Sequence, residues 1–109
     1  MDANQTEKGK AQNLVSAVGY MGKSVVSKQV IKAPTGNITL FAFDEGEGLS
    51  EHSAPFDAFV QVMDGEAEII IGGKSNIVKT GEFIIMPANV SHALKAIKQF
   101  KMMLVMIRS

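Results

Sequence analysis

Turn-forming residues cut most of this chain into segments that are too short for ordinary helices. From Lys23 onward, short runs rich in valine, isoleucine and phenylalanine alternate with glycine, proline and asparagine pairs. Such spacing is typical of β-sandwiches, jelly rolls and barrels. The sequence therefore predicts an all-β fold of about nine short strands. We place them at residues 25–32, 37–43, 49–53, 57–63, 66–71, 74–79, 83–86, 91–97 and 100–108.

The start of the chain has a different character. Residues 1–11 are polar and show no apolar periodicity, so we expect them to be disordered. Residues 13–20 have one apolar face at helical spacing, but the glycines near their end predict only a short helix or turn. We therefore expect an N-terminal extension over 1–22 and a single β domain over 23–109, which is a common size for one domain.

Two of the predicted strands are apolar on both faces. They are 83–86, with the sequence FIIM, and 100–108, which begins with the sequence FKMMLVMI. A barrel strand needs only one apolar face, because its other face ordinarily meets water. The outer faces must therefore be covered by the segment 14–20 or by another subunit, since exposed stripes of this size favour association. We expect a homodimer packed sheet on sheet.

The composition restricts the partners and the location. Eleven basic and eleven acidic residues cancel, so no net field attracts nucleic acid or an anionic membrane. Lys95, Lys98 and Lys101 are spread out, and we expect them to be solvated. Without cysteine there is no disulfide, thiolate ligand or thiol nucleophile. No apolar run approaches the roughly 20 residues of a membrane span, and residues 1–12 do not resemble a secretion signal, so we expect a cytoplasmic protein.

The chain has two histidines, and glycines frame each of them at a fixed spacing. The first motif is Gly46-x5-His52-x-Ala54-x3-Ala58-x6-Gly65. The second motif is Gly81-x5-Pro87-x-Asn89-x2-His92. Because strand-like segments separate the motifs, a closed sheet would bring the two imidazoles together.

These motifs resemble the two signature motifs of the cupin superfamily, G-x5-H-x-H-x3,4-E-x6-G and G-x5-P-x-G-x2-H-x3-N. The framing glycines, the proline, one histidine in each motif and the 15 residues from Glu66 to Thr80 between the motifs all match. The resemblance covers roughly residues 37–107. It implies a double-stranded β-helix, the jelly-roll barrel of a small single-domain cupin of the conserved-barrel (cupin-2) type.

The departures from the family pattern concern the metal site. The resemblance implies a metal held by three histidines and one glutamate. Here Ala54 stands at the second histidine position and Ala58 at the glutamate position. His52 and His92 remain as an incomplete ligand set for a divalent metal such as Fe, Mn, Ni, Zn or Cu, whereas catalytic sites usually have three protein ligands. Asn89 replaces a glycine, which is a mild change because asparagine tolerates left-handed backbone angles.

Strand alternation predicts which neighbours share a face with His52. If the alternation of faces continues unbroken from His52, then the even-numbered residues of 58–62 point into the barrel, as His52 does. A bulge near Pro55 would reverse this register and turn Asp57 or Gln61 toward the cavity. Both registers remain open from the sequence.

We interpret the chain as a cupin that binds an unidentified small molecule in an apolar barrel, with the histidines as polar groups at one end. The alanines leave room where the family carries ligating side chains. The candidate ligand-binding residues are His52, His92, Ala54, Ala58, Val60, Val62, Gln61, Leu94 and Ala96.

Two other functions stay open. A metal-dependent enzyme of dioxygenase or isomerase type would need Asp57, Gln61 or the substrate to complete the ligand set. The sequence assigns no catalytic residue for it. A structural or regulatory dimeric module would act through its dimer face or its N-terminus. The fold alone does not choose among these functions, because it supports unrelated activities.

Overall fold

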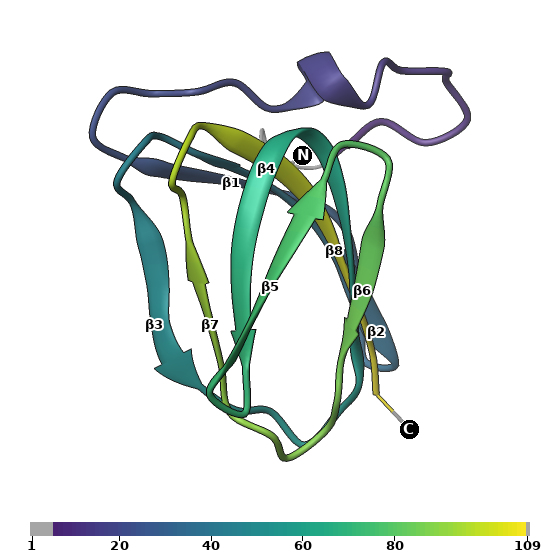
Figure 1. Ribbon diagram of the computed structural model, residues 1–109. Helices are drawn as coiled ribbons and strands as arrows, with labels where there is room; N and C mark the ends of the chain where they lie inside the picture. Colours follow the sequence, from purple (N-terminus) through teal and green to yellow (C-terminus); the bar gives the residue numbers. More distant parts are fainter. Residues whose placement is uncertain (1–5, 109) are drawn as a thin grey trace.

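The computed structural model describes residues 6–108, which form an antiparallel β-barrel (Figure 1). The all-β prediction is confirmed: the described residues contain eight strands, one short 3-10 helix and no α-helix. None of these elements is a helix that could cross a membrane. The elements are η1 (Val15–Ala17), β1 (Val25–Ala33), β2 (Gly36–Phe43), β3 (Gly48–His52), β4 (Ala58–Ile71), β5 (Lys74–Lys79), β6 (Phe83–Met86), β7 (His92–Lys95) and β8 (Phe100–Ile107).

The barrel consists of two sheets that share one strand. The first sheet has the order β1-β2-β8-β4-β6, and the second has the order β5-β4-β7-β3. The first half of β4 pairs with β6 and β8, whereas its second half pairs with β5 and β7. β4 therefore bends from one sheet into the other and joins the two.

This long strand corrects the sequence prediction at Asp64 and Gly65. The pair was predicted to form a tight turn between two strands, but β4 runs through it as one strand of 14 residues. The pairing with β8 shifts by one residue between Val62 and Asp64, and Gly65 has φ of 78°. The dipeptide therefore forms a bulge that bends a continuous strand, and the predicted nine strands become eight.

The interior follows the regular alternation predicted for residues 58–62. Ala58, Val60 and Val62 are buried, and their core includes the stacked rings of Phe43 and Phe100, whose centroids are 4.4 Å apart. Gln61 is partly exposed and lies on the opposite face of the strand, where it pairs across to Met103 of β8. The alternative register with Gln61 inside the barrel is not formed.

The N-terminal segment crosses one end of the barrel and packs on its outer face (Figure 1). Val18 is buried there against Leu40, Ala42 and Met63. The predicted short helix is the single turn η1. Of the residues expected to be disordered, 1–5 lie outside the described residues, and 6–11 form a loop with a turn.

Lys101 is the second correction, because it is not a solvated residue. Its side chain lies under the N-terminal segment, and its Nζ donates a hydrogen bond to the Val15 carbonyl at 2.7 Å. The ammonium also lies 5.0 Å from the ring centroid of Tyr20, whose hydroxyl donates to Asp64 Oδ2 at 2.6 Å. Burial and the adjacent Asp64 carboxylate raise the pKa of Tyr20 well above its usual value. These contacts attach the segment to the barrel.

The bulge at Gly65 gives a test of the fold. A Cβ at residue 65 would clash with the Gln99 carbonyl oxygen, whereas at Gly73, with φ of 81°, it would meet nothing within 4 Å. Both Gly→Ala variants adopt unfavourable backbone angles, which costs about 1–2 kcal/mol. We expect Gly65→Ala to lower the free energy of unfolding by at least roughly 1 kcal/mol more than Gly73→Ala, because only the former also clashes. Urea unfolding measures both, and equal losses would contradict the observed path of β4.

Candidate functional site

The two histidines meet at one end of the barrel, as the sequence predicted. His52 is the last residue of β3 and His92 the first residue of β7, and the two are partners in the strand pairing. Their Nε2 atoms are 3.1 Å apart, and the rings are inclined at 73°. His52 is exposed, whereas His92 is only 5% exposed. This end of the barrel lies opposite the end crossed by the N-terminal segment (Figure 1).

The hydrogen bonds define the protonation of the pair. His52 Nδ1 lies 2.7 Å from the Ser50 carbonyl oxygen, which can only accept, so this nitrogen carries a proton. In the neutral ring Nε2 of His52 is then an acceptor, and it receives the Nε2–H of His92. Nδ1 of His92 is buried and has no hydrogen-bond partner among the described residues.

The environment keeps His92 neutral. Burial lowers the pKa of His92 below its ordinary value of 6.5, and the charge that His52 can carry lowers it further. Hydrogen bonding to the Val90 backbone opposes this shift, because it favours the charged ring. At neutral pH the pair is therefore joined by one N–H···N hydrogen bond.

Two hydrogen bonds donated by backbone amides join the loops that flank the pair. The Asn89 amide donates to the Ala54 carbonyl at 2.7 Å, and the Ala88 amide donates to Asp57 Oδ1 at 2.8 Å. Asn89 has φ of 64°, so it adopts the left-handed conformation that the sequence predicted for a residue in place of glycine. Asp57 thus ties the loop after β3 to the loop after β6.

The remaining predicted site residues fall into two groups. Ala54 is half-buried beside His52, whereas Asp57 is exposed and Gln61 lies on the outer face, so the structure brings neither polar side chain to the histidines. The other members all belong to the continuous barrel core. They are Ala58, Val60, Val62, Leu94 and Ala96.

A complete metal site does not fit these residues. Two nitrogens 3.1 Å apart can both reach one ion at the usual metal–nitrogen distance of about 2.0–2.1 Å. However, no group of three or more histidine, aspartate or glutamate side chains within residues 6–108 is arranged to hold an ion. Because Ala54 and Ala58 replace the other ligands of the family's metal site, only the two imidazoles remain to bind an ion.

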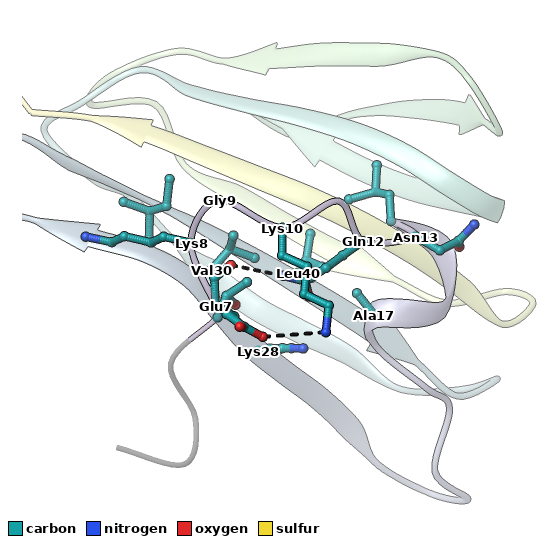
Figure 2. Close-up of a pocket in the computed structure, with 13 residues that line it drawn as sticks. Glu7, Lys8, Gly9, Lys10, Gln12, Asn13, Ala17, Lys28, Val30 and Leu40 are labelled. Atoms are coloured by element: carbon teal, nitrogen blue, oxygen red, sulfur yellow. Dashed lines mark hydrogen bonds and ion pairs between the residues drawn. The ribbon is translucent and has the colours of Figure 1, made fainter. Parts of the chain in front are cut away.

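A cavity that the sequence did not predict lies outside the barrel, between residues 6–14 and strands β1 and β2 (Figure 2). It measures about 420 Å³, and Val30 and Leu40 contribute to its apolar lining. Its polar rim includes Lys10, which forms an exposed ion pair with Glu7 at 3.7 Å. The one feature of the sequence that pointed toward this cavity was the apolar face of residues 13–20, because that face packs the N-terminal segment against the sheet. The cavity contains neither histidine and is separate from the pair.

A barrel built from two antiparallel sheets, with paired histidines at one end, is the arrangement that defines the class of double-stranded β-helix proteins. Residues 39–108 match the sequence model of the cupin domain. The chain therefore belongs to the cupin family, as the two motifs implied, and it is a small conserved-barrel cupin. No curated protein matches it.

Solved structures agree with this assignment. The chain is similar to a conserved protein of unknown function from Streptococcus pyogenes, with 34% identity and a TM-score of 0.90 over 95% of this chain and 91% of that one. It is 41% identical to a cupin 2 conserved barrel domain protein from Leptotrichia buccalis, with a TM-score of 0.87. That match covers 89% of this chain but 47% of the other, so this chain spans about half of that protein. A cupin superfamily protein from Desulfitobacterium hafniense shares the fold, with 24% identity and a TM-score of 0.88 over 97% of this chain and 96% of that one.

The lowered pKa of His92 predicts a pH dependence of stability. In the unfolded chain this ring titrates near 6.5, so below that pH the unfolded state binds a proton that the folded state resists. The contribution of His92 to stability is complete above pH 6.5 and is lost as the pH falls through the lower folded pKa. We expect the loss of unfolding free energy between about pH 7.5 and about pH 5 to be smaller in His92→Gln than in the wild type. Equal losses, or an NMR titration of His92 at or above 6.5, would contradict this.

Proposed function

We propose that this cupin binds a small molecule at the His52–His92 end of the barrel, through an oxygen acceptor on the ligand. The observation that carries the proposal is the approach of the two Nε2 atoms to 3.1 Å, with one ring exposed and the other buried. A ligand can reach the pair from the side of His52.

The chemistry of the pair favours a carboxylate or carbonyl oxygen. In the neutral pair His92 donates its Nε2–H to His52, but a protonated His52 no longer accepts it, so each ring then presents one N–H donor to a ligand. A carboxylate placed between the rings would accept from both and would favour that protonation, because hydrogen bonds to charged groups are the stronger ones. Ala54, two residues after His52, and Ala58 in the core are small and apolar, which suits a ligand with a short apolar body.

The metal-dependent enzyme remains the alternative to this proposal. The separation of the Nε2 atoms suits two ligands of one ion, but a third donor would have to come from the substrate. We therefore propose ligand binding by the imidazoles themselves. Elemental analysis of untagged protein distinguishes the two, since a stoichiometric metal that is lost in His52→Ala would support the enzyme.

A binding screen tests the proposal directly. We would titrate small aliphatic carboxylic and hydroxycarboxylic acids, and their neutral amides, into the wild type, His52→Ala and Ser53→Ala by ligand-observed NMR. Ser53 is the matched control, because it is the exposed neighbour of His52. We expect at least one acid to bind, with an affinity about tenfold or more lower in His52→Ala, as for loss of a charged hydrogen bond. The amides should bind more weakly than the acids.

Two results would count against the proposal. In the first, no acid binds to the wild type at millimolar concentration. In the second, an acid binds equally well to His52→Ala and Ser53→Ala, which would place the ligand elsewhere, for example in the cavity under residues 6–14.

A further inference from the structure

The cavity between residues 6–14 and the sheet, here called the outer cavity, forms where β1 departs from regular pairing. The register of β1 against β2 shifts between Gln29 and Ile31, so Val30 is an extra residue on β1. Successive residues of a regular strand face opposite sides, but Val30 and Ile31 both line the outer cavity. The bulge therefore presents two successive apolar residues to it.

The lining is apolar on the side of the sheet and on the side of the N-terminal segment (Figure 2). Leu40 of β2 is 1% exposed and lies on the sheet side with Val30, while Leu14 and Ala17 belong to the segment. Leu14 and Ile31 are still 42% and 51% exposed, so part of this apolar lining is open to solvent. The volume of about 420 Å³ falls within the roughly 300–1,000 Å³ of small-molecule sites. The outer cavity can therefore remove the apolar part of a small ligand from water.

The residues that line the outer cavity carry a net positive charge. Lys8, Lys10 and Lys28 line it, and Glu7 is the one acidic residue among the described residues that does so. The chain as a whole has eleven acidic and eleven basic residues, so this excess is local. Glu7 pairs with Lys10 at 3.7 Å, whereas Lys8 and Lys28 form no ion pair within residues 6–108. An anion would therefore meet positive charge that the described residues do not neutralise.

Lys28 lies at the boundary between the apolar lining and this charge. It is the cross-strand partner of Leu40 and is half-buried, so its aliphatic stem lies on the same face of the sheet as the Leu40 side chain. In Figure 2 the Lys28 side chain ends on the same side of the outer cavity as the ion pair of Glu7 with Lys10. An ammonium group next to an apolar surface suits a ligand that has a charged end and an apolar body.

We propose that the outer cavity binds a small amphiphilic anion, namely a single alkyl chain that ends in a carboxylate, such as a medium-chain fatty acid. The alkyl chain lies between Leu14 and Leu40, where both sides of the cavity are apolar. The carboxylate lies at Lys28, because hydrogen bonds between a charged donor and a charged acceptor are the stronger ones. This site shares no residue with the His52–His92 pair, so it is independent of ligand binding there.

The attachment of the N-terminal segment leaves a way into the outer cavity. The side-chain hydrogen bonds that attach the segment to the barrel come after residue 14, between the Val15 carbonyl and Lys101 and between Tyr20 and Asp64. Among the described residues, no hydrogen bond joins residues 6–14 to β1 or β2. Residues 6–14 can therefore move away from the sheet without breaking these attachments and close again on a ligand.

A matched pair of lysines tests the role of charge. Lys28 and Lys32 lie on the same strand, but Lys32 is exposed and does not line the outer cavity. We would titrate decanoate, below its micelle concentration, into the full chain as wild type, Lys28→Gln and Lys32→Gln by calorimetry, with decanol as the uncharged counterpart. We expect the wild type to bind decanoate more tightly than decanol. Lys28→Gln should weaken decanoate binding at least about fivefold, and Lys32→Gln less than about twofold.

A second matched pair tests the apolar lining. Leu14 and Val15 are neighbours with the same exposure of 42%, but only Leu14 lines the outer cavity. We expect Leu14→Ser to weaken decanoate binding at least about fivefold, because the alkyl chain loses an apolar neighbour, and Val15→Ser less than about twofold. Val15→Ser keeps the backbone carbonyl that accepts from Lys101. In NMR spectra the amide shifts that decanoate changes should lie within residues 8–14 and 28–31.

The outcomes separate the outer cavity from the histidine pair. No decanoate binding to the wild type overturns the proposal, as do equal losses within either matched pair. A loss of decanoate binding in His52→Ala, with shift changes at His52 and His92, would place the acid at the pair and would also overturn it. Conversely, decanoate bound at the outer cavity while no acid binds at the histidines supports this inference although the proposed function fails. Circular dichroism checks that each variant is folded, and Leu14→Ala, a smaller change, replaces Leu14→Ser if the latter does not fold.

Discussion

The continuity of β4 is the constraint on which the rest of the structure depends. This strand pairs with β5, β6, β7 and β8, so it is the only strand among the described residues that belongs to both sheets. Its bend at Gly65 brings Gly65 close to Gln99, where a side chain at residue 65 has no room. Beyond the bend, β4 pairs with β7 and sets His92 opposite Ile71, which fixes the position of the buried imidazole. The barrel and the histidine pair therefore depend on one bent strand.

The same strand also contributes to both the core and the outer face of the barrel. Before the bend, Ala58, Val60 and Val62 face the core, while Phe59 and Gln61 face outward. A shift of one residue in the register would exchange these faces and would place a glutamine in the core. The histidine pair lies on β3 and β7 of the second sheet, so it is separate from the apolar outer face of the first sheet.

Much of this was predictable from local sequence patterns, and the failures have physical causes. The glycines, the proline and the histidine spacings predicted the barrel and the meeting of His52 with His92. The Asp64–Gly65 pair was misread because a bulge and a tight turn use the same residue types, and only the partner strand distinguishes them. Lys101 was predicted to be solvated because its cover is the N-terminal segment, whose docking depends on contacts distant in sequence. Likewise, the place of Asp57 in the loop could not be foreseen without its partner, the Ala88 amide.

The protonation of the histidine pair is the central claim, and NMR measures it most directly. Long-range proton–nitrogen correlation spectra of the imidazoles distinguish a protonated nitrogen from a bare one in each ring. At about pH 7.5 the structure predicts Nδ1–H in His52, which donates to Ser50, and Nε2–H in His92, which donates to His52. A His92 ring protonated at Nδ1 would contradict the account. It would leave two bare Nε2 atoms facing each other, as two ligands of a metal ion do.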